Sequence, residues 1–320
     1  MTCIRCQHTD CVKAGSFGKR RVQRWKCTSC KNRFSEPHTK LTRDTFTSQP
    51  DAAERALHCL LEGCSIRSTE RLTGLNRNTI MRLLLVAGER SARLMDGRVR
   101  GLSARYLQCD EIWCYVGKKR RNVRTGDSPE MGDQWIFVAM DAETKLVTAF
   151  RIGKRSWEST SSFMRDLYER MAENRRTQIT TDGFHFYKQA VADAFGLDAD
   201  FAQLTKMFGD YGQFDGPDAR YSPPRISGVI SKVRQGDPDP RHISTSFVER
   251  QNLTMRMAMR RFTRLTNAFS KKLSHLKAAV ALHFAYYNFC RVHSSLRVTP
   301  AMEAGLADHV WSIAELLRAE

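Results

Sequence analysis

The chain has 320 residues, enough for two or three compact units, and its 41% hydrophobic and 27% charged residues are typical of a globular protein. No stretch approaches the roughly 18 uninterrupted apolar residues of a membrane span, and no basic-then-apolar leader opens the chain, which predicts a cytoplasmic protein without membrane insertion or stable disulfides. Lys and Arg number 52 against 34 acidic residues, and the net charge of +18 favours a polyanionic partner, nucleic acid above all.

Two cysteine pairs with Cys-x-x-Cys spacing stand near the amino terminus, Cys3 with Cys6 and Cys27 with Cys30. Two such knuckles supply the four thiolates that a structural zinc ion prefers. Two disulfides are the alternative, which a reducing compartment disfavours. The spacing therefore predicts a zinc ribbon over residues 1–40, with Cys11 as a packing residue outside the metal site.

A helix-turn-helix is predicted within residues 41–100. Ser65 or Ser68 is placed to cap a short helix, Gly74 to form the turn, and Asn76 to cap a longer second helix. The second helix of this motif enters the major groove of DNA, and its first turns carry the expected contacts. A helical hairpin with a charged, solvated face is the alternative. The predicted DNA-binding residues are Arg77, Asn78, Thr79 and Arg82.

Residues 101–265 contain alternating apolar patterns typical of strands. The predicted elements are strands at 106–116, 134–141 and 146–152, a helix at 157–171, a strand at 178–181 and a helix that ends near 194. This β-β-β-α-β-α order indicates an α/β fold. The segment 196–243 is an insertion rich in Gly, Pro and Asp, and we interpret residues 211–216 and 221–225 within it as loops. It would bind DNA or cover the catalytic cleft.

Two aspartates stand at positions where strands would bury them or end. Asp110 lies in the middle of the first strand, where an ionised side chain is costly unless it is paired. Alternation puts Glu111 on the opposite face, either facing outward or supporting Asp110. Asp182 directly follows the strand at 178–181. Either acid alone is more often a structural residue, but together they indicate a divalent cation, because carboxylates brought close repel one another.

Three segments, in chain order, carry a family resemblance. They are Asp110-Glu111-x-Trp113-x-Tyr115-Val116-Gly117, Thr181-Asp182-Gly183 and Val248-Glu249-Arg250-x-Asn252-Leu253-Thr254-x-Arg256. Together with the amino-terminal cysteines they resemble the insertion-sequence-one type of bacterial transposase. The resemblance implies an α/β, ribonuclease-H-like catalytic core with a DDE triad. A small zinc ribbon and an all-α helix-turn-helix domain would precede this core, and a helical extension would follow it.

By this resemblance the catalytic residues are Asp110, Asp182 and Glu249, which would bind Mg²⁺ or Mn²⁺. The implied activity is cleavage of insertion-sequence ends and joining of their 3′-hydroxyls to target DNA by two-metal phosphoryl transfer. Terminal inverted repeats and target DNA are the expected double-stranded partners. Since transposition joins two ends, we expect at least a homodimer, located with the bacterial nucleoid in the cytoplasm.

Glu249 is predicted on a helix at about 244–265, where Asn252 and Arg256 follow on the same face. Without the resemblance, Glu249 would be interpreted as a solvated residue paired with a neighbouring arginine. Three other acids remain alternatives for the third carboxylate: Asp210, Asp215 and Asp218. The predicted DNA contacts of the catalytic domain are Lys118, Lys119, Arg250, Asn252 and Arg256.

Residues 266–320 are predicted to form a carboxyl-terminal helical region that opens with an amphipathic helix at 271–288. We assign no catalytic role to His293. Two rival functions remain at this stage. One is a DNA-binding regulator that has lost catalysis, and the other is a metal-dependent nuclease that cuts DNA without joining it.

Overall fold

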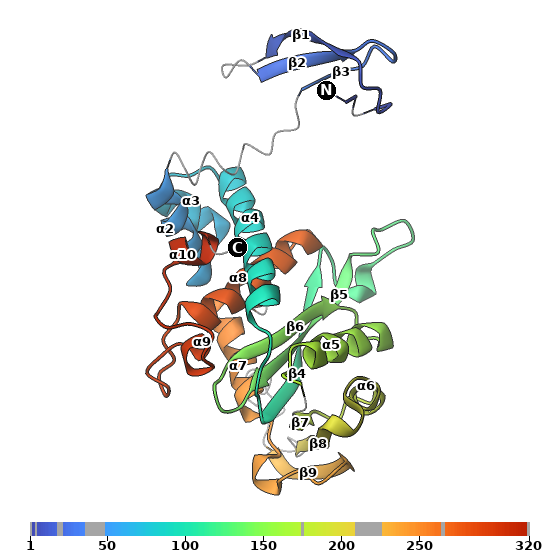
Figure 1. The fold of residues 1–320 in the computed structure, drawn as a ribbon, viewed down its shortest axis with the longest axis vertical. Helices are drawn as coiled ribbons and strands as arrows, with labels where there is room; N and C mark the ends of the chain where they lie inside the picture. The colour runs from blue at the N-terminus through green and yellow to red at the C-terminus, as the bar shows by residue number, and fades with distance from the viewer. Residues whose placement is uncertain are drawn as a thin grey trace, which may run out of the picture. The chain divides into compact units, whose positions relative to one another are not determined.

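The computed structural model describes residues 2–3, 5–17, 22–35, 49–173, 176–208, 226–263 and 266–318 (Figure 1). The chain forms two compact units, Met1–Asp51 and Ala52–Glu320. The three alternative acids Asp210, Asp215 and Asp218 lie outside the described residues. No helix in the described ranges is long and apolar enough to cross a membrane.

The first unit contains a three-stranded antiparallel sheet of β1 (Cys11–Phe17), β2 (Val22–Cys27) and β3 (Arg33–Ser35). Its buried apolar cluster consists of Cys3, Cys27 and Phe34, with Trp25 packed against it. Such a small cluster stabilises a fold of this size only weakly, and domains this small usually need a metal or disulfides.

Three helices begin the second unit: α2 (Pro50–Leu61), α3 (Ile66–Thr73) and α4 (Arg77–Arg98). The predicted caps are confirmed. Ser65 Oγ accepts a hydrogen bond from Ser68 N, Gly74 has a left-handed φ of 71°, and the Asn76 side chain accepts from Asn78 N. These short-range signals set where α3 and α4 begin and where α3 ends.

A six-stranded mixed sheet with strand order β6-β5-β4-β7-β8-β9 forms the centre of the second unit. The strands are β4 (Tyr106–Val116), β5 (Gly132–Asp141), β6 (Val147–Gly153), β7 (Thr177–Thr181), β8 (Ala199–Phe208) and β9 (Ile226–Gln235). With α5 (Trp157–Glu169) before β7 and α6 (Phe186–Phe195) after it, the predicted β-β-β-α-β-α order is confirmed. β4, β7 and β8 run parallel, and the other pairs are antiparallel.

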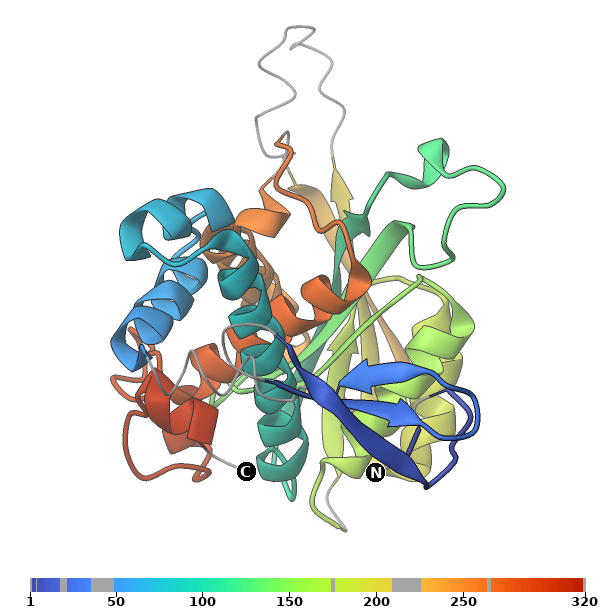
Figure 2. The same ribbon diagram turned by 90° about the horizontal axis from the view of Figure 1, so that it is seen from above.

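Helices cover both faces of this sheet. α5 and α6 pack on the face that carries Cys109 and Phe137, in a core with Phe163 and Tyr187. α7 (Ser246–Ala258) and α8 (Leu273–Phe289) lie on the opposite face, with α4 packed against α8 (Figure 2). α9 (Pro300–Glu303) and α10 (Ile313–Arg318) pack beside α8. The α4–α8 contact joins residues 52–100 to the rest of the unit. The domain bounds predicted at 100 and 265 stay predictions.

The structure differs from the secondary-structure predictions in three places. Within 196–243, β8 and β9 extend the sheet, because the edge of β7 offers backbone partners to β8, and the sequence predicted neither strand. The loops predicted at 211–216 and 221–225 lie outside the described residues. The predicted helix to residue 265 ends at Ala258, since Met259 is extended and the following 3₁₀ turn η5 (Arg260–Phe262) buries Phe262. α8 is buried on nearly all sides rather than amphipathic, because it lies between α4 and the sheet.

Short 3₁₀ turns also lie in connections of the described part of the second unit. η1 (Arg120–Asn122) lies in the long connection between β4 and β5, which projects from the body of the unit in Figure 2. η2 (Gly196–Asp198) precedes β8, and η4 (Pro240–His242) precedes α7.

Candidate active site

Asp110 and Asp182 meet where two parallel strands run side by side. The last register pair of β4 and β7 is Cys109 with Thr181, so the next residue of each strand is one of the two aspartates. Carboxylate oxygens of Asp110, Glu111 and Asp182 lie within 4.8 Å of one another. The predicted pairing of the two aspartates is therefore present in the structure.

Burial and neighbouring carboxylates make it unfavourable for both aspartates to be ionised at once. Burial raises the pKa of Asp110 to about 6, helped by the charges of Asp182 and Glu249 and opposed by hydrogen bonds from the Glu111 backbone and Asn252. Burial also raises the pKa of Asp182, against the hydrogen bond from Phe184 N and the positive charge of Arg155. Close carboxylates with raised pKa values are common at catalytic and metal sites.

Glu111 does not face outward, which corrects one of its two predicted orientations. Its side chain is only 1% exposed, because α5 and α6 cover that face of β4. Burial and the charge of Asp182 raise the pKa of Glu111 to about 8. Arg155 Nη2 lies 3.5 Å from Glu111 Oε2 and 3.6 Å from Asp182 Oδ2, so one guanidinium forms ion pairs with both carboxylates.

Glu249 stands beside this group on the first turn of α7. Its charge contributes to the raised pKa values of Asp110 and Asp182, although its oxygens are not part of the 4.8 Å group. Lys206 Nζ on β8 and Thr245 Oγ1 both donate to its carboxylate. Sequence reasoning missed Lys206 because it did not predict β8, and without that strand nothing placed the lysine near Glu249.

Two polar side chains fix α7 against β4. Gln108 Oε1 accepts hydrogen bonds from Phe247 N at 2.8 Å and Val248 N at 3.2 Å, which satisfies backbone donors at the start of the helix. Asn252 Nδ2 donates to Asp110 Oδ2 at 2.8 Å. Asn252 is only 7% exposed and lies against Asp110, and its predicted contact with DNA stays a prediction.

The donors of this site fit a hard divalent cation. All of them are oxygens, and Mg²⁺ and Mn²⁺ prefer carboxylate and carbonyl oxygens. Glu111 Oε1 and Asn252 Oδ1 are buried and have no hydrogen-bond partner among the described residues. A buried oxygen without a donor is costly, and a cation beside it would remove that cost. Asp110, Asp182, Glu111 and Glu249 are the carboxylates in reach of such an ion.

Comparisons with known proteins find similarity only among solved structures. No family model and no curated protein matches the chain. The Mos1 strand transfer complex is 14% identical over 47% of this chain and 57% of the Mos1 chain, with a TM-score of 0.22. The piggyBac transposase synaptic complex with hairpin DNA is 9% identical over 83% of this chain and 68% of that chain, with a TM-score of 0.35. The match thus spans little more than half of the Mos1 chain, and at such scores the function must be argued from the site.

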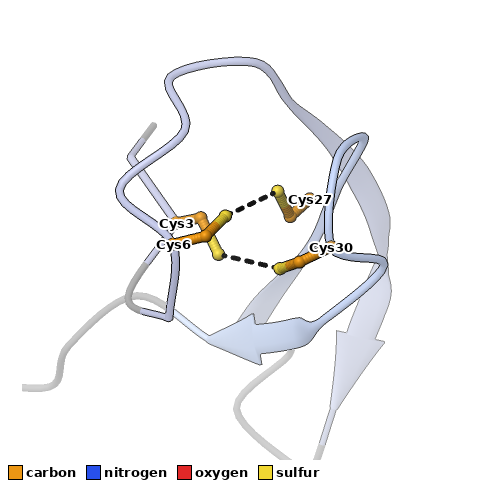
Figure 3. A group of neighbouring side chains, drawn as sticks. All are labelled: Cys3, Cys6, Cys27 and Cys30. Carbon is orange, nitrogen blue, oxygen red and sulfur yellow. Dashed lines mark hydrogen bonds between the residues drawn. The ribbon is translucent and has the colours of Figure 1, made fainter.

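The four predicted zinc ligands lie together in the first unit (Figure 3). Cys3 Sγ lies 3.6 Å from Cys30 Sγ, Cys6 Sγ lies 3.6 Å from Cys27 Sγ, and none of the four forms a disulfide. Cys11 stays outside the group and contacts the His8 carbonyl. Burial opposes ionisation of Cys3, but backbone donors at Cys6 and Arg5 lower its pKa to about 6.

Four sulfur donors this close fit the tetrahedral geometry of a structural zinc site. The alternative of two disulfides is not seen, because all four cysteines are free.

The predicted DNA contacts differ in what surrounds them. Arg77, Asn78 and Arg82 are exposed and Thr79 is half-buried in the first turns of α4. Lys118 is bound to Asp127 at 2.7 Å, whereas the Lys119 ammonium lies 6.0 Å from the ring centres of both Trp113 and Tyr115. Arg250 is exposed on α7, and Arg256 lines a cavity. Their role in DNA binding stays a prediction.

Proposed function

We propose that the chain is a DNA transposase that cleaves insertion-sequence ends and joins their 3′-hydroxyls to target DNA. The observation that carries this proposal is the meeting of Asp110 and Asp182, from adjacent parallel strands, with Glu249 beside them on α7. Such an arrangement is expected of a ribonuclease-H-like core with a DDE triad. The net charge of +18 supports DNA as the substrate.

Some side chains at this site would position the metal-binding carboxylates, and others would hold the phosphate. Two bound Mg²⁺ or Mn²⁺ ions would supply an activated water or 3′-hydroxyl and stabilise the leaving oxygen. Asn252 and β4 hold Asp110 in place, and Phe184 N holds Asp182 Oδ1 at 3.0 Å. Arg155 and Lys206 already contact the carboxylates and would hold the negatively charged phosphate beside them.

The rest of the proposal concerns DNA binding. Zinc held by Cys3, Cys6, Cys27 and Cys30 would stabilise the first unit, and α4 would present its exposed first turns to the DNA. Because two ends must be joined, we propose a dimer or larger assembly that acts on the bacterial chromosome.

Cleavage and joining of labelled element ends in Mg²⁺ or Mn²⁺ test the proposal. Asp110→Asn, Asp182→Asn and Glu249→Gln should each lower both reactions by at least about a hundredfold, because even changes behind metal ligands cost about 10–100-fold. Two exposed acids provide matched controls, Asp193→Asn on α6 and Glu169→Gln at the end of α5, and both should stay fully active.

The same assay separates the rival functions. Cleavage without joining by the wild type would identify a nuclease, and specific end binding without cleavage would identify a regulator. Full activity in Glu249→Gln, together with loss in Glu111→Gln, would make Glu111 the third ligand instead.

A further inference from the structure

A cavity of about 500 Å³ is lined in part by Trp113, Cys114 and Tyr115 of β4, the strand that also carries Asp110. It is lined by β4 and by the chain that follows α7, and its volume falls in the range of roughly 300–1,000 Å³ that is typical of ligand sites. We call it the aromatic pocket and define it by six of its lining residues: Trp113, Tyr115, Lys119, Arg256, Arg261 and Phe269.

The position of the pocket follows from the pairing of β4. β7 pairs with β4 only as far as Cys109, whereas β4 continues to Val116. Among the described strands none pairs with this edge beyond Cys109, and the next contact is the bridge between Val116 and Ser270. At about 3.3 Å per strand residue, Trp113 lies about 10 Å along β4 from Asp110, or about three base-pair steps of DNA.

Aromatic rings form the wall of the pocket that faces this edge. The ring centres of Trp113 and Tyr115 are 5.7 Å apart, and those of Tyr115 and Phe269 are 4.5 Å apart. All three residues are only partly buried, so part of each ring remains accessible. Exposed rings in a row are a stacking surface for nucleobases, since every base has a π face.

The charges of the pocket are all positive. Lys119, Arg256 and Arg261 line it, and none of the lining residues in the described part of the chain is acidic. Arg261 Nη1 donates to the neutral Ser270 Oγ at 3.0 Å, and among the described residues no carboxylate forms an ion pair with Arg261. Burial lowers the pKa of Arg261 to about 10. A buried cation without an acid favours binding of an anion.

We propose that the aromatic pocket binds an unpaired nucleobase of the DNA strand held at Asp110 and Asp182, together with the adjoining phosphate. The base stacks on Trp113 and Tyr115, and Arg261 and Lys119 face the phosphate. A base inside a duplex is stacked on its neighbours and must leave the helix to enter the pocket. This inference rests on the proposed function, because it assumes that DNA occupies the catalytic edge.

Binding measurements without Mg²⁺ or Mn²⁺ test the inference on the full-length zinc-bound protein. The probes are one labelled duplex with a single unpaired thymidine and the same duplex fully paired. We expect tighter binding of the unpaired probe by about 5- to 100-fold, the effect of stacking one base on aromatic side chains. Trp113→Ala should abolish this preference, whereas Trp113→Phe should retain most of it. Lys119→Gln, a change at an exposed residue, should weaken binding of the unpaired probe.

Tyr168→Ala, a change of a 41% exposed tyrosine on α5, is the matched control and should leave the preference intact. Equal binding of both probes by the wild type, or an unchanged preference in Trp113→Ala and Tyr115→Ala, would overturn the inference. So would binding of free thymidine monophosphate as tight as that of the unpaired probe.

The binding outcomes do not depend on catalysis. A protein that prefers the unpaired base but does not cleave DNA would refute the proposed function alone. A protein that cleaves and joins DNA without this preference would refute the pocket alone.

Discussion

Replacing Asp110 by asparagine should stabilise the metal-free protein at neutral pH. In the folded protein the pKa of Asp110 is raised from its ordinary value of 3.8 to about 6. At about 1.36 kcal/mol for each pKa unit, this difference corresponds to about 3 kcal/mol of folding free energy. Asparagine carries no charge and its Oδ1 can still accept the hydrogen bond of Asn252, so Asp110→Asn should recover up to about this amount.

The sign of the pH dependence follows from the direction of the shift. Because the folded pKa is higher than the unfolded one, the protonated carboxyl stabilises the fold below about pH 4, and this contribution is lost as the pH rises through about 6. The stability gap between Asp110→Asn and wild type should therefore be near zero at about pH 4 and largest at pH 7. Thermal or denaturant unfolding at both pH values measures it.

Metal should close the stability gap. At an Mn²⁺ concentration of a hundred times its Kd, wild type gains about 2.7 kcal/mol, nearly the whole advantage of Asp110→Asn at pH 7, and Asp110→Asn should gain far less. Asp193→Asn, on an exposed part of α6, should behave as wild type throughout. A variant that is less stable than wild type by the same amount at both pH values, or that gains as much from Mn²⁺, would refute the reasoning.

Three further predictions concern other parts of the chain. Glu111→Gln should match wild type in stability near pH 4 and exceed it by a margin that grows up to about pH 8 in chemical unfolding, because over this range the unfolded chain releases the Glu111 proton while the folded protein, with a Glu111 pKa of about 8, retains it. Cys6→Ser should remove bound zinc and the amide NMR dispersion of the first unit, and retention of one zinc per chain would contradict this. Gly88→Ala should cost about 3 kcal/mol or more, because its Cβ would lie 2.3 Å from Ala278 Cα, whereas Gly97→Ala on the same helix meets nothing within 4 Å and should stabilise by about 0.5–1 kcal/mol.

Local patterns were enough to predict several elements of the fold. The strand at 106–116 is present with the predicted bounds, and Ser65, Gly74 and Asn76 occupy the predicted caps and turn. These features depend on neighbouring residues, through side-chain alternation, capping hydrogen bonds and the left-handed backbone of a glycine. The two Cys-x-x-Cys pairs were also predictable from the local sequence, since this spacing lets both thiolates of a pair bind one metal ion.

Contacts between distant segments were not predictable in this way. Nothing near Lys206 or Arg155 in the sequence indicates that they contact Glu249 and Asp182. The burial of Glu111 depends on α6, some 75 residues later, and the partner of Asn252 is set by the packing of α7 on β4.

The sequence by itself determined the kinds of elements present, their caps, the four clustered cysteines and the two aspartates at strand positions. Only the tertiary structure decided that β4 and β7 lie side by side, that α7 brings Glu249 to the same edge, and that an aromatic pocket opens beyond the end of β7. The physical reason is that side-chain alternation and capping act over a few residues. Strand order and helix packing instead depend on burying apolar faces from the whole chain at once.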